Sequence, residues 1–175
     1  MQTTYVPSDN FLDAETSSVE IEIIEKSELW KNLDIIEQGI ASAVEETIYQ
    51  NNATRDVSYQ VTIVLSNDEE IQNLNNLFRN INKPTNVLSF PFGDNSKLPP
   101  LDAIPLGDIV LSFETIEHEA NTQGIKFDHH LYHMVIHGLL HLLGYDHETE
   151  KDAIRMEAKE IEIMQKLALP NPYAN

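Results

Sequence analysis

Two kinds of hydrophobic spacing alternate along the chain. Short runs of alternating or β-branched apolar residues predict strands, and apolar residues three or four positions apart predict helices. The first pattern indicates strands over residues 19–24, 57–66, 86–92 and 106–112. The second indicates helices over 27–50, 67–81, 113–124, 128–144 and 147–169. We therefore expect an α+β fold: a single domain with a small mixed β-sheet of about four strands packed against helices.

Individual residues refine these elements. Ser27 is a candidate N-cap for the first helix, and Pro91 indicates that 86–92 is an edge strand or a strand end. Residues 93–105, with three prolines and one glycine, are expected to form a loop. The helix over 67–81 is expected to bury one face, formed by Ile71, Leu74, Leu77 and Phe78.

The chain of 175 residues fits one domain. We expect residues 1–18 to be a polar, disordered tail, 19–169 to form the folded domain and 170–175 to be a C-terminal tail. The start has neither the basic nor the apolar segment of a signal peptide, and no apolar run could cross a membrane. With no cysteine, a metal site must use His, Asp or Glu. We expect a cytoplasmic protein.

The formal net charge of −18 argues against a broad basic surface for nucleic acid. The charge is uneven, however. Residues 71–100 contain one acidic residue, Asp94, against Arg79, Lys83 and Lys97. If the protein meets a polyanion, this segment is the expected contact, although a count this small could also arise by chance.

Three histidines form a candidate metal site. His137 and His141 are four positions apart on one predicted helix, so their imidazoles can face the same ion. Gly144 can adopt the left-handed conformation that ends a helix, which would let His147 return to the same point. Three imidazoles leave a fourth position for water, the arrangement of catalytic zinc. We expect one Zn²⁺, although such a site also accepts Ni²⁺, Co²⁺ or Cu²⁺.

Two neighbouring residues, His133 and Asp146, could support this site. His133 lies one turn before His137 and is interpreted as a core residue or a supporting partner of the site. Asp146 could accept a hydrogen bond from a ligand imidazole, or it could bond its own backbone in a turn. The two interpretations of Asp146 remain equal.

Gly138 changes the expected chemistry. The spacing H-x-x-x-H-x-x-G-x-x-H is that of metzincin zinc proteases, which carry Glu directly after the first His. That Glu is the general base for peptide hydrolysis. Here Gly138 replaces it, which predicts a hydrolytic site that does not cleave peptides. We also expect the glycine to leave room beside the metal for a bulky ligand.

These residues carry a resemblance. The segment "HMVIHGLLHLLGYDH" (133–147) closely resembles the signature of the YbeY family of bacterial metal-dependent endoribonucleases. Two upstream segments are also similar: "LNNLFRNINKPTNVLSFPF" (74–92) and "LGDIVLS" (106–112). So is the acidic helix after the histidines, and the likeness spans roughly residues 20–168. One departure is Asn86, where family members commonly carry Asp.

The resemblance implies a function and a site. The family's zinc ligands fall on His137, His141 and His147, its functional arginine falls on Arg79, and its fold has a small mixed sheet with the histidine helix central. It implies a zinc-dependent endoribonuclease, specific for single strands or acting on structured RNA, that works on ribosomal RNA or its precursors in ribosomal RNA maturation and ribosome quality control. Ribosomal proteins or other assembly factors are further expected partners, and DNA is not. Two alternatives stay open: a zinc peptidase with a base from elsewhere, and a ribosome-assembly factor whose metal is not catalytic.

Overall fold

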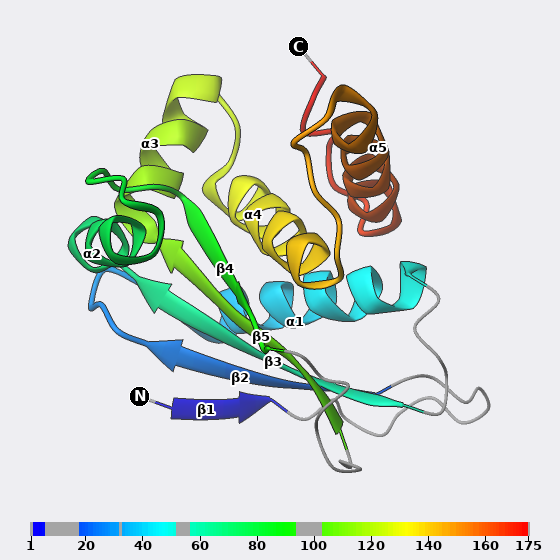
Figure 1. Cartoon of the computed structure of the whole chain (residues 1–175), viewed down its shortest axis with the longest axis horizontal. Helices are drawn as coiled ribbons and strands as arrows, with labels where there is room; N and C mark the ends of the chain where they lie inside the picture. The colour runs from blue at the N-terminus through cyan, green and yellow to red at the C-terminus, as the bar shows by residue number, and fades with distance from the viewer. Residues whose placement is uncertain (1, 6–17, 32, 52–56, 94–102, 175) are drawn as a thin grey trace.

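The computed structural model describes residues 2–5, 18–31, 33–51, 57–93 and 103–174 (Figure 1). The strands are β1 (Gln2–Tyr5), β2 (Val19–Glu25), β3 (Ser58–Ser66), β4 (Val87–Pro91) and β5 (Ala103–Ser112). The helices are α1 (Leu33–Gln50), α2 (Asp68–Arg79), α3 (Phe113–Gln123), α4 (Phe127–Leu142) and α5 (Glu150–Lys166).

The strands form one mixed sheet in the order β1-β2-β3-β5-β4. β2, β3 and β5 are parallel, while β1 and β4 pair antiparallel at the two edges. The α+β class and the mixed sheet are confirmed, as is the edge position that Pro91 indicated. β-branched residues fill the central strand, whose Val61, Ile63 and Leu65 are buried.

The N-terminal strand corrects two expectations. Residues 2–5 pair with β2, so the sheet has five strands, and the expectation of a tail over 1–18 is wrong at these residues. Residues 6–17 lie outside the described residues. Inside the sheet, β5 already begins at Ala103 and pairs with β3, so the loop expected over 93–105 ends sooner.

The first helix begins later than its pattern predicts. α1 starts at Leu33 rather than at Ser27, whose hydroxyl instead accepts a bond from the Leu29 N–H at 3.4 Å within a turn. The turn lets Trp30 enter the core, where its indole N–H donates to the Ser66 carbonyl at 2.8 Å. Burial of the indole ring therefore overrides helix propensity in this segment.

The helices cover the sheet unequally (Figure 1). α4 packs on β4 and β5 and also contacts α1, α3 and α5. It is the most buried helix, so the central position expected for the histidine helix is confirmed. α2 covers the opposite face near β4, where Ile71, Leu88 and Val110 form a second small core.

The last turn of α2 departs from its expected burial. Ile71 is buried and Leu74 half-buried, but Leu77 is 72% exposed and Phe78 63% exposed. Leu77 is rotated by about 120° from Ile71 around the helix. Phe78 lies on the same side as Ile71, but its ring meets that of Phe90 on the edge strand at 5.0 Å.

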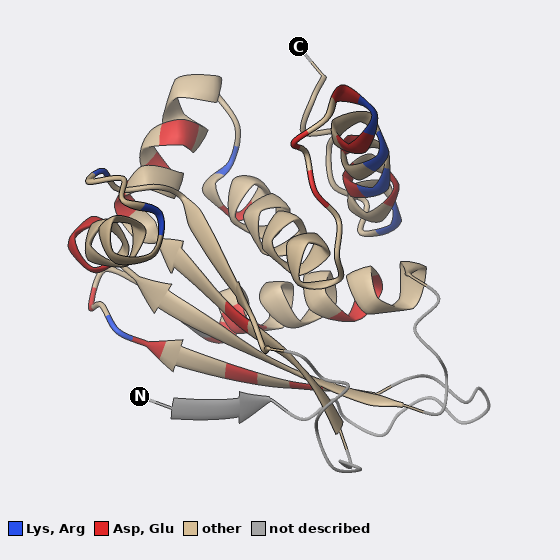
Figure 2. Ribbon diagram, viewed as in Figure 1, with Lys and Arg blue, Asp and Glu red and all other residues tan. Residues whose placement is uncertain are grey.

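Charge is also distributed unevenly (Figure 2). Acidic residues occupy the first turn of α2, and Arg79 lies in its last turn. None of the described helices is both long and apolar enough to cross a membrane.

Candidate functional site

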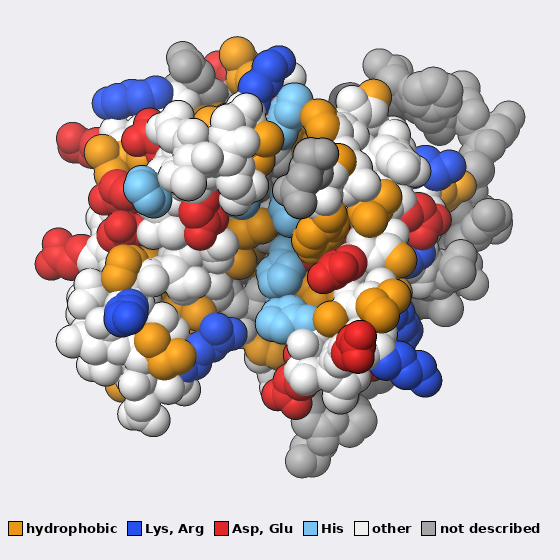
Figure 3. Space-filling view, turned by 90° about the horizontal axis from the view of Figure 1, so that it is seen from above, with side chains coloured by type: hydrophobic (Ala, Val, Ile, Leu, Met, Phe, Trp, Pro, Cys, Tyr) orange, Lys and Arg blue, Asp and Glu red, His pale blue; other side chains and the backbone are white. Residues whose placement is uncertain are grey.

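Helix α4 brings the first two histidines together. His137 and His141 lie one turn apart, and their Nε2 atoms approach to 3.1 Å. Their ring centroids are 4.7 Å apart. Histidine side chains line a groove between two halves of the surface (Figure 3).

A glycine turn returns the chain to these rings. Gly144 has φ +89°, the left-handed conformation that its sequence position predicts. Its N–H donates to the His141 carbonyl, and the next N–H, of Tyr145, donates to that of Leu140. The turn places the His147 ring 5.5 Å from that of His137 and 5.0 Å from that of His141. One ligand atom from each of the three histidines lies within 4.8 Å of the others.

Hydrogen bonds on the far side of two rings fix their tautomers. His137 Nδ1 lies 2.7 Å from a carboxylate oxygen of Glu160, and His141 Nδ1 lies 3.0 Å from the Tyr145 carbonyl. Both partners only accept, so each Nδ1 carries the proton and each Nε2 presents a lone pair.

These two lone pairs converge, which a cation would stabilise. Tetrahedral zinc with Zn–N distances of about 2.0–2.1 Å separates two ligand nitrogens by about 3.3 Å. The observed Nε2–Nε2 separation of 3.1 Å is close to that value. The three imidazoles therefore fit a single metal ion.

Glu160 supports the histidines from α5. It is fully buried and also lies 3.2 Å from Nε2 of His133, while the Tyr173 hydroxyl donates to it. Burial alone would raise the pKa of Glu160, but hydrogen bonds from His133 and His137 outweigh it and bring the pKa to about 2. The interpretation of His133 as a supporting residue is confirmed, and residue 173 of the expected C-terminal tail takes part in the same network.

The environment keeps His141 neutral. Burial lowers the pKa of its imidazole, and repulsion from His137 and His147 lowers it further. A neutral imidazole is the form that binds metal.

Asp146 takes the second of its two expected roles. Its carboxylate accepts the backbone N–H of His147 at 2.7 Å, which stabilises the turn. Among the described residues, no hydrogen bond joins Asp146 to an imidazole.

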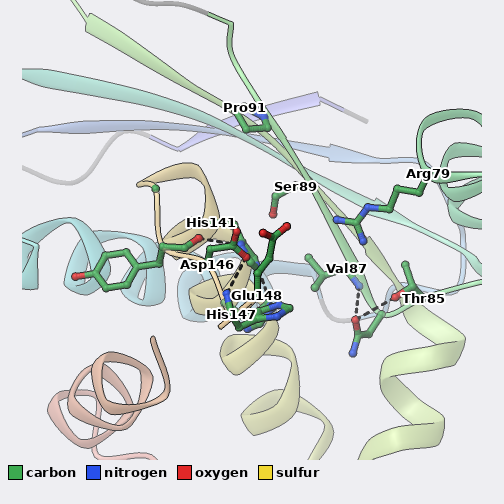
Figure 4. A pocket seen from close by; sticks show the side chains of 13 residues that line it. Arg79, Thr85, Val87, Ser89, Pro91, His141, Asp146, His147 and Glu148 are labelled. Carbon is green, nitrogen blue, oxygen red and sulfur yellow. Dashed lines mark hydrogen bonds between the residues drawn. The ribbon is translucent and has the colours of Figure 1, made fainter. Parts of the chain in front are cut away.

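A pocket of about 740 Å³ opens over the three histidines. One wall comes from the turn after α4 and includes Asp146 and Glu148; the other comes from β4, with Val87 and Ser89. Arg79, at the end of α2, also lines this pocket, and Figure 4 shows its side chain extending from α2 towards it. The structure therefore brings together all four site residues that the sequence predicted.

Gly138 contributes to packing and does not leave the space that we expected. A Cβ at this position would lie 3.0 Å from Ile109 Cγ2, 3.0 Å from Ser89 Oγ and 3.2 Å from Val87 Cγ2. Its carbonyl accepts the Ser89 hydroxyl at 2.9 Å. The expectation that Gly138 leaves room for a bulky ligand is therefore wrong, because side chains of the sheet fill that space.

Asn86 lies on the pocket wall in a separate network. Its amide donates to Glu119 at 3.0 Å, and its oxygen accepts the Val87 N–H at 2.7 Å. Glu119 also lies 2.7 Å from Nε2 of buried His130. The hydrogen bond to His130 is the main cause that lowers the pKa of Glu119, and that to Asn86 adds to it. The amide of Asn86 can therefore donate a hydrogen bond to the Glu119 carboxylate, which an ionised aspartate at this position could not do.

Sequence reasoning missed Glu160, Tyr173 and Glu148. Glu160 falls on the buried face of α5 beside Met156, Ile163 and Met164, and a carboxylate within an apolar helical stripe was its only signal. Tyr173 had no signal, because its partner depends on how the chain folds after α5.

Comparisons with known proteins agree with the motifs. A family model described as endoribonuclease YbeY matches residues 22–168. A Rhodopseudomonas palustris protein named endoribonuclease YbeY is 38% identical over 96% of this chain and 88% of its own. A Bartonella bacilliformis protein of the same name is 44% identical over 86% of this chain and 93% of its own. A solution structure from Thermotoga maritima is 25% identical, covers 89% of this chain and 99% of its own, and has a TM-score of 0.49.

Proposed function

The chain belongs to the YbeY family of endoribonucleases, and we propose that it hydrolyses ribosomal RNA or its precursors at the centre formed by His137, His141 and His147. It is accordingly a hydrolase acting on RNA phosphodiester bonds. The observation that carries the site is the convergence of three imidazoles in a pocket that Arg79 also lines. We place this activity in the cytoplasm.

We propose that the resident ion is zinc, held by Nε2 of His137, Nε2 of His141 and a ring nitrogen of His147. When bound, zinc supplies Lewis-acid chemistry: it lowers the pKa of a coordinated water to about 7 and polarises a phosphoryl oxygen. Glu160 holds the His137 ring in the tautomer that presents Nε2.

The chain supplies the remaining groups itself. Arg79 is exposed and forms no ion pair within the described part of the chain, so its guanidinium is available to bind phosphate oxygens in a bidentate manner. Among the pocket carboxylates, Asp146 is bonded to its own turn, whereas Glu148 has no hydrogen-bond partner among the described residues. We therefore assign Glu148 as the acceptor of the proton lost by the attacking water.

The experiment compares two substrates and four proteins. Zinc-loaded wild type, His141→Ala, Glu148→Gln and the control His129→Ala are incubated with a ribosomal RNA fragment and, separately, with casein. His129 lies on the same helix but outside the three-histidine cluster. We expect wild type and the control His129→Ala each to bind about one zinc and to cleave RNA. His141→Ala should lose both properties, and Glu148→Gln should keep zinc but cleave about 10²–10⁴-fold more slowly.

Other outcomes separate the alternatives. Cleavage of casein with intact RNA would establish a zinc peptidase. A protein without cleavage activity whose triple His→Ala variant still binds ribosomal particles and restores growth would establish an assembly factor. Unchanged RNA cleavage by Glu148→Gln would remove only its assignment as base.

A further inference from the structure

Exposed apolar side chains occur at the end of α2 and directly after β4. Phe78 and Leu77 lie in the last turn of α2, Ile81 follows the helix, and Phe92 follows β4. Each is between 48% and 72% exposed. Soluble proteins seldom expose apolar residues together without a binding role.

The Phe78 ring is held in place by Phe90. Their centroids lie 5.0 Å apart with a 62° angle between the ring planes. Phe90 itself packs on the small core of Ile71, Leu88 and Val110. Phe78 nevertheless stays 63% exposed, so this edge-to-face pair presents a supported aromatic surface to solvent.

This surface adjoins the pocket across a single strand. Side chains alternate along β4: Leu88 and Phe90 face the core under α2, whereas Val87 and Ser89 line the pocket. β4 is an edge strand, so a flexible chain can pass around it from one side to the other. Arg79 follows Phe78 directly, and consecutive Cα atoms are only about 3.8 Å apart.

The surrounding charge favours an anionic ligand. Neither Arg79 nor Lys83 forms an ion pair within the part of the chain that the structure describes. Lys83 is held beside α2 because its carbonyl accepts the Asn75 amide at 2.8 Å. In a chain with a net charge of −18, two unpaired cations beside exposed rings suit a polyanion better than a second copy of the protein.

We propose that Phe78, supported by Phe90, stacks an unpaired base of single-stranded RNA next to the phosphate that Arg79 contacts. The proposal rests on the proposed function and adds a base-binding subsite to it. Aromatic rings bind successive bases without strong sequence preference. A duplex offers no unstacked base to this surface, so stacking on Phe78 gives a residue-level basis for the single-strand specificity that the family resemblance implies.

The experiment measures RNA affinity separately from cleavage. The probe is a fluorescein-labelled RNA single strand of mixed sequence, titrated with the zinc-loaded protein by stopped-flow fluorescence anisotropy before cleavage proceeds, with the same strand in a duplex as comparison. Phe78→Ala removes the ring, Phe78→Leu keeps an apolar side chain, and Phe78→Trp keeps an aromatic one. Tyr49→Ala is the matched control, because Tyr49 is an aromatic residue 60% exposed and does not line the pocket.

We expect Phe78→Ala and Phe78→Leu to bind the single strand about 5- to 150-fold more weakly, the loss of one stacked base. Phe78→Trp and Tyr49→Ala should bind like wild type, and the duplex should bind all five proteins weakly and equally. If wild type binds and cleaves RNA but Phe78→Ala has the same affinity, the proposal fails and the surface belongs to another partner. If wild type neither binds nor cleaves RNA, the proposed function itself fails. A loss shared by Tyr49→Ala would also overturn the assignment to Phe78.

Discussion

At the scale of single residues, Glu160 connects the metal centre to the rest of α5. Its carboxylate oxygen Oε1 contacts His137 and its Oε2 contacts His133. The Tyr173 hydroxyl donates to Oε2 as well. We expect Glu160→Gln to weaken zinc binding about 10- to 100-fold. An amide has one acceptor oxygen instead of two, so it can no longer accept a hydrogen bond on each side from the two rings. Zinc affinity measured against a chromophoric chelator checks this.

The matched control is Glu162→Gln. It removes a carboxylate two positions along the same helix that pairs with Lys159 and contacts no histidine among the described residues. An unchanged zinc affinity in Glu160→Gln, or an equal loss in Glu162→Gln, would contradict the role of Glu160.

Arg79 should affect turnover much more than folding. Its side chain is exposed and bonded to no carboxylate among the described residues, so Arg79→Ala removes little buried area. Loss of one preorganised charge donor typically lowers kcat by about 10²–10³. Arg79→Lys should restore it only in part, since an ammonium lacks the bidentate geometry. Cleavage rates, zinc content and Tm are measured together; wild-type cleavage by Arg79→Ala would end the assignment.

At the scale of elements, the contact between α4 and the sheet depends on Gly138. We expect Gly138→Glu, which restores the residue of zinc peptidases, to destabilise the fold by about 2–5 kcal/mol. The added side chain would meet Ile109, Val87 and Ser89 and bury an unpaired carboxylate. Urea unfolding measures the change. Gly93→Glu is the control, because nothing lies within 4 Å of a Cβ at that glycine. A stable Gly138→Glu protein that cleaves casein would refute this prediction.

The link between α3 and α4 should make stability depend on pH. The pKa of Glu119 is lowered by its hydrogen bonds, chiefly that to His130. A lowered folded-state pKa contributes stability that is complete above the unfolded pKa of about 4.5 and is lost as pH falls through the folded value. We therefore expect Glu119→Gln to be less stable than wild type at pH 7, with the difference shrinking below about pH 4.5. Unfolding in urea at both pH values tests this; a difference that grows in acid would contradict it.

The sequence predicted those elements whose signals are local. The histidine helix and the turn at Gly144 follow from spacing and one glycine, and the backbone angle of Gly144 and the geometry of the three histidines agree with them. The predicted start of the first helix was wrong, because helical spacing around Trp30 does not reveal that its indole bonds to Ser66, far along the chain. Glu160 was missed for the same reason: its histidine partners lie on another helix.

At the scale of the whole molecule, a net charge of −18 sets the conditions for binding RNA. Arg79 lines the pocket and Lys83 follows α2 close to it, so these two cations neutralise few phosphates. For single strands, log K falls with log salt by about 0.7 for each phosphate contacted, which predicts a slope near −1.4. Kd measured between about 50 and 200 mM KCl should show weak binding with this slope. The Arg79→Ala/Lys83→Ala variant should lose this salt dependence. Tight binding insensitive to salt would be incompatible with these contacts.

The bond between Tyr173 and Glu160 also has a consequence for biosynthesis. The first ligand, His137, is translated before α5 and Tyr173, and at about 5–20 residues per second the intervening segment takes roughly 2–7 s. During that time the other two histidines and then Glu160 are synthesised, but the Tyr173 hydroxyl that donates to Glu160 is still absent. Metal binding is coupled to folding of the ligand set, so the complete hydrogen-bond network around the histidines forms only after residue 173 has been synthesised.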